Sequence, residues 1–192
     1  MEIKKVGVLG CGLMGSGIAQ VAATAGCDVI VLEQDQKFLD KGFAGIDKSL
    51  ARMVERGVEK NGITAEQKAA ALARLKGTTS MADLADCDII IEAIIENVPE
   101  KRKTYAQLDA IVKKDAIFAT NTSSICVAEL MTATQRPERF IGLHFFNPVP
   151  MMKMVEVVKT IATAPEVFET AVEFGARLGK FRCAPATRLD SS

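Results

Sequence analysis

The sequence predicts an α/β fold in which helices cover both faces of a doubly wound, mostly parallel β-sheet. Short apolar runs recur along the chain, and most of them show no alternation of polar and apolar residues. Such runs are typical of strands buried on both faces, and helical segments separate them. A glycine-rich turn directly follows the first run. We therefore expect strands at residues 6–9, 28–32, 88–91, 116–119, 139–143 and 152–158.

The segments between these strands carry helix signals. Two charged segments form an insertion, residues 37–76, that we expect to project from the sheet as a helical hairpin. Its second helix begins with a capping box, Thr64 with Gln67. Pro99 stands in the first turn of a later helix, and Gly179 ends the last one. The expected helices are residues 13–25, 38–59, 64–75, 99–113, 125–131 and 165–178.

The composition is that of an ordinary globular protein. The chain has 192 residues, enough for one domain or slightly more, and 48% of them are hydrophobic. Its 24 basic and 24 acidic residues cancel, which argues against a nucleic acid or an anionic membrane as partner. No run reaches the length of a membrane span, and the N-terminus lacks the apolar core of a signal peptide. We expect a cytoplasmic protein, with an organelle-matrix protein that has lost its leader as the less favoured alternative.

The five cysteines form no framework. They are scattered and contain no Cys-x-x-Cys pair, which is typical of reduced cytosolic thiols. We therefore expect neither a disulfide nor a metal site.

Gly10, Gly12 and Gly15 form a G-x-G-x-x-G motif between the first expected strand and the first expected helix. The first glycine permits a tight turn, the second lets a pyrophosphate approach the backbone, and the third lets helix and strand pack closely. Glu33 ends the second strand, where a carboxylate binds a ribose 2′-hydroxyl and repels a 2′-phosphate. The motif predicts a Rossmann-type site for NAD rather than NADP, which also includes Leu13 and Met14. A glycine turn needed only for packing is the alternative.

His144 is the only histidine of the chain, and imidazole is the one side chain whose unperturbed pKa lies between pH 5 and 8. Twelve residues later, Glu156 interrupts an apolar run, where a carboxylate is costly unless it has a partner. We expect the two side chains to pair, with Glu156 orienting an imidazole that accepts a proton. A histidine satisfied within the core and a structural ion pair are the alternatives.

Four motifs occur in order along the chain: residues 10–15, residues 121–124 (Asn-Thr-Ser-Ser), residues 142–148 (Gly-Leu-His-Phe-Phe-Asn-Pro) and residues 153–157 (Lys-Met-Val-Glu-Val). Together, from about residue 3 to Lys180, they resemble the N-terminal domain of the 3-hydroxyacyl-CoA dehydrogenase family. The resemblance implies an NAD-dependent oxidoreductase of fatty-acid or butyrate-type metabolism. Its reaction is the oxidation of an L-3-hydroxyacyl-CoA to the 3-ketoacyl-CoA, or the reverse.

The resemblance also implies catalytic roles for four side chains. It makes His144 the general base and Glu156 its partner, places Ser123 near the substrate oxygen and puts Asn147 beside the nicotinamide. Each role has a simpler alternative. The serines also suit the start of the following helix, where we expect Ser124 to cap and Ser123 to face the site. The Asn147-Pro148 pair also suits an ordinary turn.

Three further residues fall at family positions near the cofactor: Glu96, Lys101 and Asn121. The alternative for Glu96 and Lys101 is a solvated surface pair without a function.

The resemblance ends at Lys180. We expect residues 1–180 to form the NAD-binding domain and residues 181–192 to form a tail outside the family pattern, with part of a further strand at 181–184 left open. In the family, a helical domain follows that supplies most of the dimer interface and an asparagine near the histidine. We expect this chain to lack that domain. We expect the exposed apolar face to favour a homo-oligomer or a partner chain.

These expectations leave two functions open. The first is a short dehydrogenase acting on an acyl-CoA substrate. The second is a module that binds NAD, with or without CoA, and has little or no turnover. A relative that retains only the fold is disfavoured, because no structural need explains the set His144, Glu156, Ser123 and Asn147 together.

Overall fold

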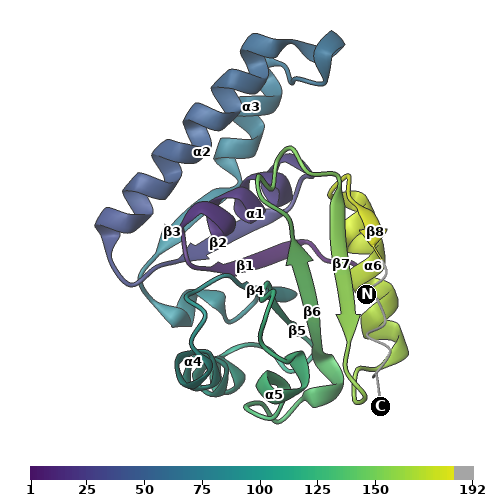
Figure 1. Cartoon of the computed structure of the whole chain (residues 1–192). Helices are drawn as coiled ribbons and strands as arrows, with labels where there is room; N and C mark the ends of the chain where they lie inside the picture. Colours follow the sequence, from purple (N-terminus) through teal and green to yellow (C-terminus); the bar gives the residue numbers. More distant parts are fainter. Residues whose placement is uncertain (184–192) are drawn as a thin grey trace.

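The computed structural model describes residues 1–183, and they contain one eight-stranded sheet with helices on both faces (Figure 1). The strand order is β3-β2-β1-β4-β5-β6-β7-β8, and all neighbouring strands are parallel except β6 and β7. This confirms the predicted doubly wound, mostly parallel sheet. The strands are β1 (Lys5–Leu9), β2 (Asp28–Leu32), β3 (Leu75–Thr78), β4 (Ile89–Glu92), β5 (Ile117–Thr120), β6 (Phe140–Phe145), β7 (Met154–Lys159) and β8 (Phe181–Cys183).

The sheet separates two apolar layers. One layer contains side chains of α1 (Leu13–Thr24) and α6 (Pro165–Arg177), and the other contains side chains of α4 (Val98–Ile111) and α5 (Val127–Met131). Neighbouring residues of β4 illustrate the division, because Ile89 and Ile91 join the first layer while Ile90 joins the second. Burial on both faces explains why the central strands have continuous apolar sequences.

The insertion forms the expected hairpin and projects from the sheet in Figure 1. It consists of α2 (Gln36–Arg56), the short η1 (Val58–Lys60) and α3 (Ala65–Ala73). The capping box is confirmed, since the Gln67 N–H donates to Thr64 Oγ1 and the Thr64 N–H donates to Gln67 Oε1. The 21 residues of α2 extend over about 30 Å, so the hairpin carries side chains well away from the sheet.

One strand, β3, was not among the expected ones, and β8 occupies residues 181–183, where a further strand had been left open. The helix expected at residues 64–75 ends at Ala73, and β3 begins two residues later. β3 lies at the sheet edge and contains the polar sequence Leu-Lys-Gly-Thr, so it lacks the apolar run that marks a buried strand. β8 pairs parallel to β7 and continues the sheet past the expected boundary at residue 180. The rest of the expected tail, residues 184–192, lies outside the described residues.

The direction of chain winding reverses between β1 and β4. From β1 the chain builds outward through β2 and β3, and it then returns to place β4 on the other side of β1. In open parallel sheets, ligands bind at such a reversal, outside the carboxyl ends of the strands. Among residues 1–183, no helix has the length and apolar character required to cross a membrane.

Candidate active site

The glycine motif occupies the reversal point, and its three glycines have different reasons to be glycine. Gly10 has a φ of +90°, and a Cβ there would stand 2.8 Å from the Ala93 carbonyl oxygen. A Cβ at Gly15 would overlap the carbonyl oxygen of Gly10. Gly12, in contrast, has an ordinary φ of −73°, and a Cβ there would meet nothing within 4 Å.

Packing therefore accounts for Gly10 and Gly15 but not for Gly12. Gly12 is the N-cap of α1, where the first backbone N–H groups have no partner within the helix. An open, Cβ-free approach to a helix N-terminus is what a pyrophosphate needs. The residues present thus fit a dinucleotide, which argues against a glycine turn that serves packing alone.

Glu33 connects the second strand to the glycine turn. Its Oε2 accepts a hydrogen bond of 2.9 Å from the Cys11 N–H, and its Oε1 accepts one of 2.8 Å from the Gln34 N–H. Each carboxylate oxygen can accept a further bond. Glu33 therefore braces the turn while keeping the acceptor capacity that a ribose hydroxyl requires.

Two adjoining clefts extend from this turn. The glycine cleft, of ≈ 510 Å³, is lined in part by Gly10, Gly12, Glu33, Thr79 and Glu100. The histidine cleft, of ≈ 310 Å³, is lined in part by Met14, Glu96, Lys101, Asn121, Ser123, His144 and Asn147. Ala93 and Ile94 line both clefts. One elongated ligand can therefore run from the glycine turn to the histidine. Leu13 is exposed at the start of α1 and lines neither cleft.

His144 and Glu156 face each other across the antiparallel pair β6 and β7. His144 Nδ1 lies 3.1 Å from Glu156 Oε2, and both side chains are partly exposed. An ionised carboxylate only accepts hydrogen bonds, so in the neutral ring the proton resides on Nδ1. Nε2 is then left as a proton acceptor. The expected pairing is confirmed, and the alternative of a histidine satisfied within the core is wrong.

The Asn-Thr-Ser-Ser motif surrounds the same cleft. Asn121 Oδ1 accepts a hydrogen bond of 2.8 Å from the Phe145 N–H, which ties the end of β5 to the end of β6 beside His144. Ser123 is exposed and lines the cleft. The expectation that Ser124 caps the next helix is wrong: α5 has no side-chain cap, and Thr122 Oγ1 accepts from the N–H groups of Ser124 and Ile125 instead.

Asn147 lies on the loop between β6 and β7. Lys180 is buried beneath this loop and donates through Nζ to the carbonyl oxygens of Val149 and Met152. Burial also lowers the pKa of Lys180. The last residue of the expected family segment therefore holds the loop that carries Asn147, a contact that no local sequence pattern indicates.

Lys101 is not part of a solvated surface pair. Its side chain is 1% exposed, and its Nζ lies 2.8 Å from Glu92 Oε1 and 3.2 Å from Glu96 Oε2. Glu92, fully buried at the end of β4, was missed in the sequence. The signal for it was available, because an acid that directly follows a buried strand is also what singled out Glu33.

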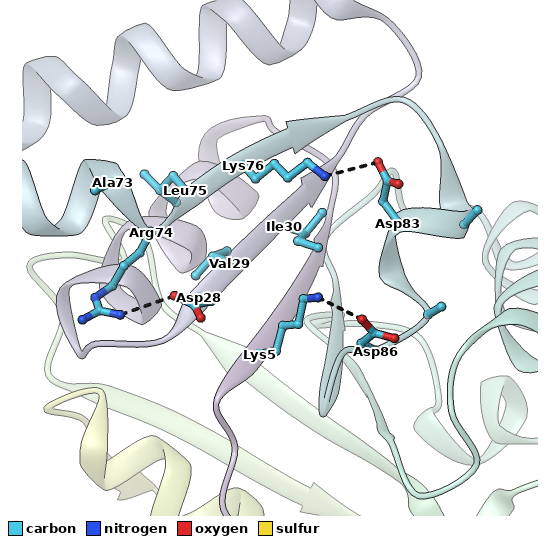
Figure 2. A pocket seen from close by; sticks show the side chains of 12 residues that line it. Lys5, Asp28, Val29, Ile30, Ala73, Arg74, Leu75, Lys76, Asp83 and Asp86 are labelled. Atoms are coloured by element: carbon cyan, nitrogen blue, oxygen red, sulfur yellow. Dashed lines mark hydrogen bonds and ion pairs between the residues drawn. The ribbon is translucent and has the colours of Figure 1, made fainter.

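Figure 2 shows a separate hollow that begins at the amino ends of β1 and β2. Three ion pairs account for all six charged side chains drawn there. Because these charges cancel in pairs, the hollow has no net charge to attract a ligand. It lies at the amino ends of the strands, whereas both clefts lie at the carboxyl ends. The pairs are Lys5–Asp86, Arg74–Asp28 and Lys76–Asp83.

Comparison with known proteins agrees with this geometry. The sequence profile of the family described as 3-hydroxyacyl-CoA dehydrogenase, NAD binding domain, matches residues 5–184. A 3-hydroxybutyryl-CoA dehydrogenase of Bradyrhizobium diazoefficiens is 49% identical over 178 residues, which are 93% of this chain and 59% of that protein. The mitochondrial hydroxyacyl-coenzyme A dehydrogenase of Rattus norvegicus is 44% identical over 180 residues, 93% of this chain and 57% of that protein.

A solved structure supports the same relation. The (S)-3-hydroxybutyryl-CoA dehydrogenase of Ralstonia eutropha superposes with a TM-score of 0.90 at 42% sequence identity, covering 95% of this chain and 63% of that one. The chain thus spans about three fifths of the length of the relatives it matches.

Proposed function

This chain belongs to the 3-hydroxyacyl-CoA dehydrogenase family, whose NAD-binding domain it forms, and we propose that it interconverts an L-3-hydroxyacyl-CoA and the 3-ketoacyl-CoA with NAD. The observation that carries the proposal is the His144–Glu156 pair beside a cleft that adjoins the glycine turn. Relatives named 3-hydroxybutyryl-CoA and hydroxyacyl-CoA dehydrogenases support the acyl-CoA substrate class.

NAD supplies the hydride acceptor of the oxidation when it is bound. The chain itself handles the proton, because hydride can leave carbon 3 only as the hydroxyl proton is removed. His144 Nε2 accepts that proton, since Nδ1 is engaged with Glu156. The resulting imidazolium is stabilised by the Glu156 carboxylate 3.1 Å away. In the reducing direction, the same imidazolium returns the proton to the 3-keto oxygen.

Ser123 and Asn147 complete the polar side of the histidine cleft. We assign the Ser123 hydroxyl to the reacting oxygen and Asn147 to the nicotinamide. Asn121 acts indirectly: its Oδ1 accepts a hydrogen bond from the Phe145 N–H and so positions the backbone next to His144.

The cofactor is assigned to both clefts. The α1 N-terminus, including Gly12, Leu13 and Met14, receives the pyrophosphate. Glu33 binds the adenosine ribose from the glycine cleft, and Glu96 with Lys101 lies at the nicotinamide end in the histidine cleft.

The test is the reduction of acetoacetyl-CoA by NADH. We expect His144→Gln to lower the rate by about 10²–10⁴-fold, the usual contribution of a general acid or base. Glu156→Gln removes the orienting charge and also lowers the rate, whereas Glu173→Gln, an exposed acid on α6, leaves it unchanged. Retained activity in His144→Gln would refute the assignment of the base.

The second candidate is a module that binds NAD without turnover. The exposure of the site favours it: Ser123 is exposed and His144 is partly exposed, whereas catalysis depends on preorganised groups from which water is excluded. The assay therefore compares this chain with a version extended by the remaining length of a relative. Activity only in the extended version supports the module for the chain as it stands, and activity in both supports the enzyme.

A further inference from the structure

One buried charge beside the clefts has no part in the proposed reaction. Glu92 is the last residue of β4, paired in register with Leu9 of β1 and Thr120 of β5. Its side chain is 0% exposed. A carboxylate buried at the centre of a sheet is destabilising unless it is paired and hydrogen-bonded, so its presence calls for a reason beyond packing.

Hydrogen-bond donors surround both oxygens of the Glu92 carboxylate. Oε1 accepts from Lys101 Nζ at 2.8 Å and from the Ile94 N–H at 2.9 Å. Oε2 accepts from Lys101 Nζ at 3.0 Å and from the Thr120 hydroxyl at 2.8 Å. Four hydrogen bonds from three donor groups hold an ionised carboxylate in one orientation, and two of the four come from the Lys101 ammonium.

Lys101 connects the buried Glu92 to Glu96 in the histidine cleft. The same Nζ lies 3.2 Å from Glu96 Oε2, which also accepts from the Thr122 hydroxyl at 3.1 Å. Glu96 is 43% exposed and lines the cleft together with His144. Both of these contacts use Oε2, so Oε1 is the oxygen available to a ligand. Because Glu92 already compensates the Lys101 charge, Glu96 retains the net negative charge of the three.

We propose that Glu92 is a positioning residue for the cofactor. It fixes the Lys101 ammonium and neutralises it, so that Glu96 presents a charged carboxylate oxygen to the ribose hydroxyls of the nicotinamide half. The inference rests on the proposed placement of that half in the histidine cleft. The adenosine half is outside its reach, since Glu33 and Gly12 line the other cleft.

The test is the affinity of the full chain for NADH and for ADP, which contains only the adenosine half, measured by calorimetry. Glu92→Gln keeps the shape and removes the charge. We expect it to weaken NADH binding about tenfold, the scale of one hydrogen bond to a charged group, and to leave ADP binding unchanged. Glu92→Asp, which keeps the charge, recovers part of the loss. Equal weakening of both ligands, or none, overturns the proposal.

A second comparison separates positioning from a structural role. In a Glu96→Gln background, Glu92→Gln should cause no further loss of NADH affinity, because Glu92 acts through Glu96. An additive loss contradicts that route.

A third variant keeps the proposal testable if Glu92→Gln unfolds the protein. Glu92→Gln with Lys101→Met removes both buried charges, a change that buried pairs commonly tolerate. We expect the double variant to fold and to weaken NADH binding by less than Glu96→Gln does, because Glu96 keeps its charge but loses the Lys101 contact that orients it. Unchanged NADH affinity, a loss as large as that of Glu96→Gln, or an equal loss for ADP overturns the proposal. These readouts are binding constants, so they are independent of the turnover of His144→Gln that tests the proposed function.

Discussion

Replacing Gly12 by alanine tests whether the glycine motif serves a ligand or only the fold. Gly12 adopts φ −73° and ψ −163°, a conformation that alanine adopts without strain, and the added methyl meets nothing within 4 Å. The variant should therefore fold. The same space is where the pyrophosphate is assigned, at the N-terminus of α1.

The expected magnitudes for folding and binding differ widely. Alanine restricts the unfolded chain, which stabilises by about 0.4–1 kcal/mol. It is also a poorer N-cap than glycine, which costs about 1 kcal/mol. The net change in the free energy of unfolding is thus within about 1 kcal/mol. In the complex, a methyl between backbone and pyrophosphate displaces two charge-assisted hydrogen bonds of about 1.5 kcal/mol each, a loss of about 100-fold in NADH affinity.

The assay is calorimetric titration with NADH beside a thermal unfolding curve for each variant. Gly45→Ala is the matched control: Gly45 is exposed within α2 and also has open space around it, so the change should stabilise by up to about 1 kcal/mol and leave NADH affinity unaltered. Gly15→Ala should fail to fold normally, because its Cβ overlaps Gly10. If Gly12→Ala melts normally and binds NADH within twofold of the parent, the pyrophosphate does not lie against Gly12.

Three further predictions concern charge and thiol chemistry. Burial alone would raise the pKa of Asp88, but hydrogen bonds from Lys113 and two backbone N–H groups hold this pKa below its ordinary value of 3.8. Asp88→Asn should therefore lower the free energy of unfolding by about 1–3 kcal/mol at pH 7, as measured by urea denaturation. The difference between the two proteins should shrink as the pH falls below 3.8, because Asp88 then becomes protonated. Iodoacetamide at pH 8 should label the exposed Cys126 but not Cys87, because burial raises the pKa of the Cys87 thiol to about 12; equal labelling in peptide mass spectra would contradict this. Glu33→Gln should raise the ratio of NADPH to NADH affinity about tenfold by removing a repelling charge, and an unchanged ratio in titrations would remove Glu33 from the ribose site.

The predicted and observed folds differ at β3, a strand whose sequence lacks the apolar run typical of buried strands. All six expected strands lie inside the sheet, between the edge strands β3 and β8, and the structure contains each of them within a few residues of the expected bounds. β3 was missed because its residues are polar and partly exposed at the sheet edge. Only pairing with β2 makes this segment a strand, and pairing partners are not encoded in local periodicity.

The candidate site shows the same division between local and long-range information. The functions of Gly10 and Gly15 in the turn follow from local backbone conformation, so their spacing was sufficient to predict them. Thr122, and not Ser124, accepts the hydrogen bonds from the backbone N–H groups before α5. Several neighbouring hydroxyl side chains suit such a turn, so the sequence alone did not show which of them would accept.

The sequence by itself determined the order of strands and helices, the glycine turn and the NAD-binding family to which the chain belongs. These properties depend on residues close together in the chain, where hydrophobic pattern and backbone preference act. The sequence also predicted that His144 pairs with Glu156, but only the tertiary structure decided that the pair forms across two antiparallel strands, and that Lys101 joins the buried Glu92 to Glu96. Strand pairing and helix packing bring those charges together, and burial then determines how strongly they interact.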